Sequence, residues 1–170
     1  MSTETQQMDA KMAACMAHAR PTDQHGLLRQ FEGAWKAEVK MWMGPGEPQV
    51  STGTMTNTLI LNGLFLEHDY RDDAGMFQGK GTWGYNTLDK RWEGQWLDTM
   101  ASWMQLEQGH HDPATNSWHM VGQMTDPGTG QILIKRSLIR VVDENTHVME
   151  MYFTTPLGEN KGMEITYRRA

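Results

Sequence analysis

Cysteine is nearly absent from this chain of 170 residues, which contains only Cys15. A single thiol excludes an internal disulfide framework. No apolar run is long enough to cross a bilayer as a helix, and the first residues lack the basic and apolar regions of a signal peptide. These features predict a soluble cytoplasmic protein without a membrane partner.

Basic residues are also scarce. The chain has 15 Lys and Arg against 21 Asp and Glu, a formal net charge of -6. Nucleic-acid binding depends on clustered Lys and Arg that neutralise phosphates, and the aromatic residues here are not interleaved with such a cluster. We therefore expect no nucleic-acid partner.

Several catalytic motifs are missing. Neither H-E-x-x-H nor a three-histidine spacing occurs, so we expect no metal site, and no G-x-S-x-G elbow occurs either. The one G-x-G-x-x-G, from Gly79 to Gly84, is followed by residues that alternate in polarity and not by a helix. This context favours a β-hairpin over a dinucleotide site. The expected turn at 86–89 pairs Trp83 with Trp92 and lets aromatic rings lie close to glycine backbone.

Methionine and tryptophan, in contrast, are abundant, with 15 and 7 residues. Flexible Met and large amphipathic Trp side chains suit an adaptable apolar cavity. An ordinary Met-rich core explains the same composition equally well.

Two regions follow from the pattern along the chain. Residues 1–22 form a predicted helical extension. Its methionines at helical spacing pack on the domain or on a partner, a second copy included, or the segment stays partly disordered. Residues 23–170 form a single predicted domain, which opens with a short helix capped by Asp23. From Ala34 onward, polarity alternates with period two and turn signals recur, which predicts about ten short antiparallel strands in a barrel or a sandwich.

The clearest turn is Asn62-Gly63, the preferred type I′ dipeptide. It pairs Leu59 with Leu66, Asn57 with His68, and Met55 with Tyr70, and it puts these residues on the inward face. The same alternation carried onward places Met104 and Leu106 inward. The strand QILIKRSLIRVV is apolar on both faces, so its orientation stays open, with Arg136 or Arg140 as the arginine that would point inward.

Several segments together resemble the DUF1579 family of bacterial proteins of unknown function: FEGAWKAEVKMWMGPGEP, GTMTNTLILNGLFLEHDY, GKGTWGYNTLDKRWEGQWLDTM, HDPATNSWHMVGQMTDP, HVMEMYFTT and MEITYRR. The resemblance runs from His25 almost to the end of the chain. It implies an all-β, calycin-like (lipocalin-like) antiparallel barrel but no activity. In such barrels a G-x-W on the first strand places a Trp at the closed end, under an Arg of the last strand. Trp35 and Arg169 fit this role in barrel closure.

A closed barrel would gather polar and aromatic side chains inside. The predicted ligand-binding set is Asn57, His68, Tyr70, Trp83, Tyr85, Trp96, Asp98, Met104, Met120 and Met151, with His147 as a further candidate. Asp98 is the most informative member, because Asp is seldom buried without a partner. It either pairs with an inward Arg or backbone amides, or anchors a ligand. His68 is either a satisfied core histidine, a general base, or an axial haem ligand.

The leading functional hypothesis is a binding module for a small, mostly apolar or aromatic molecule in the barrel lumen. The alternative is an enzyme, an isomerase, lyase or hydrolase, in which Asp98 and His68 act as acid and base. A weaker alternative is haem binding through His68, with no other cofactor expected. The fold alone does not choose among them.

Overall fold

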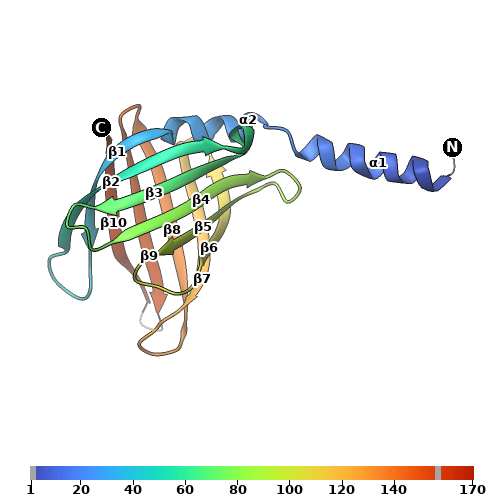
Figure 1. Ribbon diagram of the computed structural model, residues 1–170. Helices are drawn as coiled ribbons and strands as arrows, with labels where there is room; N and C mark the ends of the chain where they lie inside the picture. Colours follow the sequence, from blue (N-terminus) through green and yellow to red (C-terminus); the bar gives the residue numbers. More distant parts are fainter. Residues whose placement is uncertain (1–2, 156–157) are drawn as a thin grey trace.

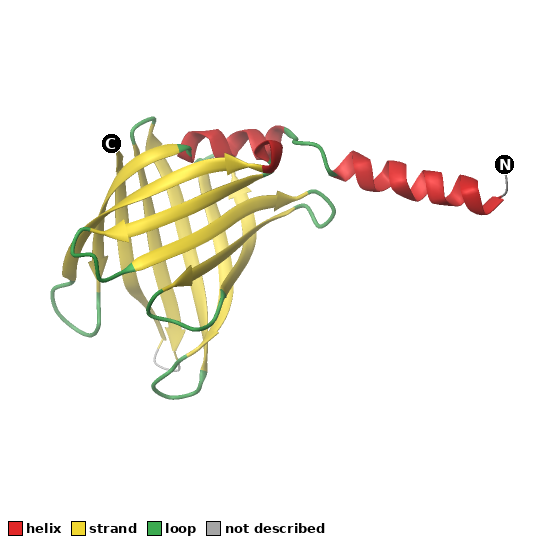
Figure 2. Ribbon diagram, in the orientation of Figure 1, coloured by secondary structure: helices red, strands yellow, loops and turns green. Residues whose placement is uncertain are grey.

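The chain folds into a closed antiparallel barrel in the computed structural model, which describes residues 3–155 and 158–170 (Figures 1 and 2). Each strand pairs with its neighbours in sequence, and β1 pairs with β10 to close the ring. The strands are β1 (Gly33–Met41), β2 (Gln49–Ile60), β3 (Phe65–Asp72), β4 (Gln78–Asn86), β5 (Arg91–Asp98), β6 (Gln105–Asp112), β7 (Ser117–Thr125), β8 (Ile132–Asp143), β9 (Thr146–Thr155) and β10 (Gly158–Arg169). The prediction of a ten-stranded antiparallel barrel is confirmed.

Two helical segments differ in how they relate to the barrel. Helix α1 (Thr3–His18) extends away from it (Figure 1) and buries none of its residues. It therefore does not pack one face on the barrel, one of the roles the sequence allowed, although its last residue, His18, is hydrogen-bonded to Thr87 at 2.9 Å. Within the described residues, no helix has the length and apolar character that a membrane span requires.

Helix α2 (Asp23–Gly26) and the 3-10 helix η1 (Leu27–Phe31) lie across one end of the barrel (Figure 2). The N-cap is Thr22 and not Asp23, so the predicted cap is wrong by one residue. The backbone N–H of Thr22 donates to Nδ1 of His25 at 3.0 Å, so the His25 side chain satisfies the backbone amide of the N-cap residue. Leu28 and Phe31 of η1 point into the barrel and are buried.

The β2–β3 turn follows its sequence. Asn62 and Gly63 have φ of 61° and 81°, as a type I′ turn requires, and Leu64 N–H donates to the Leu61 carbonyl at 3.3 Å. The predicted pairs of Leu59 with Leu66, Asn57 with His68, and Met55 with Tyr70 are all formed.

The β4–β5 hairpin has a different register from the predicted one. Trp83 pairs with Gly94 and not with Trp92, whose partner is Tyr85. The loop covers residues 87–90, because Asn86 still pairs with Arg91 while its Oδ1 accepts the backbone N–H groups of Leu88 and Asp89. The four-residue loop thus starts one residue later than expected. Each β4 residue pairs with a β5 residue two positions beyond its predicted partner, so the same side chains still face inward.

The predicted inward direction of Met104 and Leu106 is wrong, and the direction of β8, which the sequence left open, is settled. Met104 and Leu106 are 62% and 60% exposed, because the irregular connection between β5 and β6 shifts the alternation by one residue and turns Gln105 and Glu107 inward. On β8, the inward residues include Lys135 and Ser137, which are 5% and 0% exposed. Neither candidate arginine points inward: Arg136 pairs with Glu159 on the outer face, and Arg140 is exposed.

Candidate functional site

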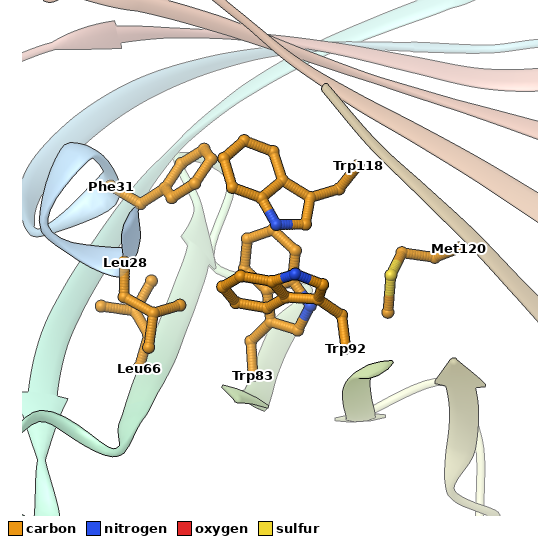
Figure 3. Close-up of a cluster of buried hydrophobic side chains, with 7 residues drawn as sticks. All are labelled: Leu28, Phe31, Leu66, Trp83, Trp92, Trp118 and Met120. Atoms are coloured by element: carbon orange, nitrogen blue, oxygen red, sulfur yellow. The ribbon is translucent and has the colours of Figure 1, made fainter. Parts of the chain in front are cut away.

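The half of the lumen under η1, which we call the capped half, is filled by aromatic side chains (Figure 3). The ring centres of Trp83, Trp92 and Trp118 lie 5.1 to 5.6 Å apart, and Phe31 contacts Trp83 and Trp118 at 5.3 and 5.1 Å. The buried members are Leu28, Phe31, Leu66, Trp83, Trp92, Trp118 and Met120. Burial of this many large rings stabilises the closed end by several kcal/mol.

Three predicted ligand residues belong to this packing. Trp83 is 8% and Met120 1% exposed, and both lie inside the capped half. Tyr85 packs at its edge, with its ring centre 5.5 Å from that of Trp92 and 5.9 Å from that of His25. In the structure, these three side chains pack against other core side chains of the capped half.

The other half, which we call the far half, is different because many of its inward-facing side chains keep accessible surface. It is lined by His68, Tyr70, Trp96, Asp98, Gln105, Glu107, Lys135, Met149, Met151, Met163 and Tyr167. Of these, Tyr70, Lys135 and Tyr167 are buried. Tyr70 and Tyr167 belong to a second buried cluster with Trp35, Ala37, Val39, Met55 and Ile165, and Trp96, Met149 and Met163 pack against this cluster. Packing inside a protein normally leaves inward side chains of a filled core with almost no accessible surface.

Glycines shape the aromatic wall of the far half. A Cβ at Gly79 would collide with the Trp96 ring, and a Cβ at Gly53 would collide with the Tyr70 ring. Gly81 lies beneath both Trp96 and His68: a Cβ there would be 2.9 Å from Trp96 Cε3 and 3.2 Å from His68 Cδ2. The rings therefore lie against the strand backbone, as the glycine pattern predicts.

His68 is held by a short chain of hydrogen bonds. Asn57 Nδ2 donates to the Phe31 carbonyl at 2.8 Å, which fixes the orientation of its amide. Asn57 Oδ1 then faces His68 Nδ1 at 2.7 Å and can only accept, so Nδ1 carries the proton. Burial lowers the pKa of His68 to about 4, which keeps the imidazole neutral at pH 7.

Two tyrosines lie near His68 on the same side of the lumen. Tyr70 is on the same face of β3, and Tyr167 of β10 is paired with Ala37, which is paired in turn with Gly53 under the Tyr70 ring. Burial raises the pKa of both phenols, with a Tyr70–Tyr167 interaction raising that of Tyr167 further. Both hydroxyls therefore stay protonated at neutral pH.

His147 closes this side of the lumen toward the cap. Its ring stacks on Tyr167, with centres 4.5 Å apart and planes at 18°, and meets the edge of Trp35 at 4.4 Å. Burial, with smaller effects from His68 and Arg169, lowers its pKa to about 3. Its Nδ1 is buried and has no hydrogen-bond partner among the described residues.

Trp35 and Arg169 meet at the capped end. The guanidinium carbon of Arg169 lies 4.2 Å from the centre of the Trp35 ring, and Trp35 Nε1 donates to the Phe31 carbonyl at 2.7 Å. Arg169 also donates to the carbonyls of Glu32 at 2.9 Å and of Gln30 and Glu144 at 3.3 Å. This is the arrangement that the G-x-W pattern and the final arginine predict.

The opposite wall carries an ion pair that sequence reasoning missed. Lys135 pairs with Glu107, and the side chains are 6% and 12% exposed. Lys135 Nζ also donates to Gln105 at 3.0 Å, and Ser137 donates to Glu107 at 3.0 Å. A buried ion pair adds little net stability against an apolar pair of the same volume, but removing one partner leaves the other charge buried and unpaired.

Asp98 has partners on both oxygens. Trp96 Nε1 donates to Oδ2 at 3.1 Å, and the Met100 backbone N–H donates to Oδ1 at 2.9 Å. Asp98 thus orients the Trp96 ring and starts the turn after β5. A backbone amide is one of the partners that the structural role predicted for it, but the other partner is the Trp96 indole and not an arginine.

A family model described as "Protein of unknown function (DUF1579)" matches residues 20–169. The chain belongs to the DUF1579 family. The predicted family is confirmed, and the match extends over the barrel and its capping helices.

Two solved structures are similar to this DUF1579 chain. One is a redesigned β-barrel with 15% identity, a TM-score of 0.42, and coverage of 86% of this chain and 95% of its own. Another, EF1p2_mFAP2b bound to DFHBI, has 10% identity, a TM-score of 0.42, and coverage of 86% of this chain and 99% of its own. A search of curated proteins finds no match.

Among the described residues of the DUF1579 chain, no group of three or more His, Cys, Asp and Glu side chains is arranged to hold a metal ion. The atom that would bind haem iron is His68 Nε2, and haem binding stays a prediction. Two clefts open on the outer surface, of about 430 Å³ beside Lys40, Trp42 and Lys161 and about 270 Å³ over the threonines of β2. Neither cleft includes a predicted site residue.

Proposed function

We propose that this DUF1579 barrel binds a small, mostly apolar aromatic molecule in the far half of its lumen. The observation that carries the proposal is the contrast between the two halves: Trp92 and Trp118 of the capped half are 1% and 0% exposed, whereas Trp96 and Met151 of the far half keep accessible surface. Small-molecule sites combine apolar and aromatic walls with a few polar groups. The far half has both.

The polar groups lie on opposite walls. His68 and Tyr70 are on β3, while Lys135 and Ser137 are on β8, which is five strands away in the closed ring of ten. An aromatic ligand between them would contact the Trp96 ring and the flexible side chains of Met149 and Met151. Binding would displace water from apolar surface. The ion pair of Glu107 and Lys135 would keep its hydrogen bonds to Ser137 and Gln105.

The outer clefts are weaker candidates. The larger one contains Lys161, which pairs with Glu150 and Glu164, and Lys40, which lies 3.8 Å from Glu164. Its charges therefore satisfy one another on the surface, where such pairs form readily without a ligand.

A titration with 2-naphthol tests the proposal. Met151→Trp fills the far half, so we expect it to weaken naphthol binding at least tenfold, measured by calorimetry. Leu106→Trp adds the same side chain on the outer face, where Leu106 is 60% exposed, and should bind like the wild type. Equal binding to all three proteins, or binding to none, would contradict a lumen site.

The second candidate function is an enzyme, and the observation that favours it is a neutral His68 with an unprotonated Nε2. In this hypothesis His68 removes a proton from a bound substrate. Asp98 is the weaker half of the proposed pair, since Trp96 and Met100 occupy its oxygens. Turnover of a bound compound that His68→Gln abolishes, with the fold intact by circular dichroism, would support the enzyme; turnover by the variant would exclude His68 as the base.

A further inference from the structure

The hydrogen-bond chain from the cap to the lumen decides which nitrogen of His68 is free. Since Nδ1 donates to Asn57 and the ring is neutral, Nε2 has a lone pair and no proton. His68 can therefore accept one hydrogen bond at Nε2 and can donate none there.

Nε2 of His68 faces accessible space. Within residues 3–155 and 158–170 it has no hydrogen-bond partner, yet it is not one of the fully buried polar atoms that lack a partner. His68 itself keeps part of its surface while burial lowers its pKa. His68 is therefore an inward-facing side chain whose Nε2 is not fully buried.

Gly81 brings this acceptor beside an aromatic ring. A Cβ at Gly81 would lie 3.2 Å from His68 Cδ2, which is bonded to Nε2, and 2.9 Å from Trp96 Cε3. A planar ligand that packs on Trp96 would therefore present its edge to His68. The groups beneath and beside it are backbone and an indole whose N–H is already bound to Asp98.

We propose that the lumen ligand carries a neutral hydroxyl, as in a phenol or naphthol, and donates its O–H to His68 Nε2 while its ring packs on Trp96. This inference rests on the proposed function and names the chemical class of its ligand. A carboxylate or an ether presents only acceptors to a nitrogen that is itself an acceptor. A cation is disfavoured, because the same surroundings keep His68 and His147 neutral.

The expected discrimination is large for such a small change in the ligand. An analogue without the O–H leaves Nε2 without a partner and without the water that the ligand displaced. Sites built to bind a hydroxyl reject analogues that lack it more strongly than apolar pockets reject a missing methylene.

Three probes test the inference by calorimetry: 2-naphthol, naphthalene and 2-methoxynaphthalene. We expect the wild type to bind naphthol at least about tenfold more tightly than either analogue, which corresponds to about 1.4 kcal/mol. Naphthalene is smaller and the ether larger than naphthol, so a preference for naphthol over both does not come from size. In His68→Phe the preference should fall below about twofold, whereas in His110→Phe, the same change at an exposed histidine of β6, it should persist.

The outcomes separate the two claims. Equal binding of all three probes to the wild type would overturn the hydroxyl inference and leave lumen binding intact. Binding of none would overturn both. A preference that persists in His68→Phe would show that another group reads the hydroxyl and would overturn the role of His68.

An NMR measurement needs no variant. Nitrogen-15 spectra of the wild type should show His68 as the neutral Nδ1–H form, and naphthol should shift the Nε2 resonance more than methoxynaphthalene does. A proton on Nε2 in the free protein would overturn the inference whatever the probes do.

Discussion

His68 Nδ1 and Asn57 Oδ1 lie 2.7 Å apart across the β2–β3 pairing, and Asn57 in turn binds the last carbonyl of the capping helix η1. The cap thus sets the orientation of the lumen imidazole. One asparagine links the element that closes the barrel to the acceptor in its lumen.

Asn57→Asp should raise the pKa of His68. A carboxylate beside Nδ1 stabilises the imidazolium, and the bond to the Phe31 carbonyl loses its donor. Histidine NMR titration measures the change. Asn86→Asp, in the β4–β5 turn, is the control and should leave His68 as in the wild type; an unchanged His68 in Asn57→Asp would contradict the proposed chain.

Stability should fall as the pH drops from 7 to 5. Burial lowers the pKa of His68 to about 4 and of His147 to about 3, so in this window the unfolded chain binds protons that the folded chain does not. Proton binding then stabilises the unfolded state, which lowers the free energy of unfolding at pH 5 by about 2 kcal/mol per histidine. Urea unfolding at the two pH values measures the loss.

The variants of this pH experiment separate the contributions. The difference in unfolding free energy between pH 7 and pH 5 contains a contribution from His68 and one from His147. His147→Gln should remove about half of this combined contribution. The exposed His110, changed to Gln, should leave the difference as it is. A wild type equally stable at both pH values would contradict the burial of neutral histidines.

Lys135→Met should cost about 3 to 5 kcal/mol of unfolding free energy, because Glu107 is left buried without its cation. The double variant Lys135→Met with Glu107→Leu should recover most of the loss, since two apolar side chains replace two charges. Urea unfolding tests both variants. Arg136→Met removes a more exposed ion pair with Glu159 and should cost less than about 1 kcal/mol; a similar cost for Lys135→Met would contradict a buried pair.

Arg169→Met should destabilise the barrel by about 1 to 3 kcal/mol, because it removes the stacked cation over Trp35 and the donors to three backbone carbonyls. Its neighbour Arg168 is exposed and faces outward, so Arg168→Met is the matched control. Thermal unfolding compares the two. Equal midpoints would mean that the stack does not hold the ends of the chain together.

Local signals predicted much of the fold. Asn62-Gly63 set the β2–β3 register, since its backbone geometry admits one pairing, and strand alternation with recurrent turns gave ten antiparallel strands. The register of β4–β5 was wrong by two, because the turn signal from Asn86 to Asp89 also fits a loop that starts one residue later.

The site was predicted in part, for reasons that lie in the irregular segments. Alternation cannot be carried through the connection 99–104, so Met104 was placed inward and Glu107 was not recognised. On β8, apolar residues on both faces hid the inward direction of Lys135. The β2–β3 turn, in contrast, located Asn57, His68 and Tyr70 on one inward face.

The most direct test of ligand binding in the lumen uses the methionines as reporters. Methyl NMR spectra of methionine-labelled protein would be recorded during a 2-naphthol titration. We expect shifts at Met149, Met151 and Met163, which face the far half, and none at the exposed Met12, Met43 and Met76. Shifts confined to the exposed methionines, or absent from the far half at saturating naphthol, would contradict the proposed function.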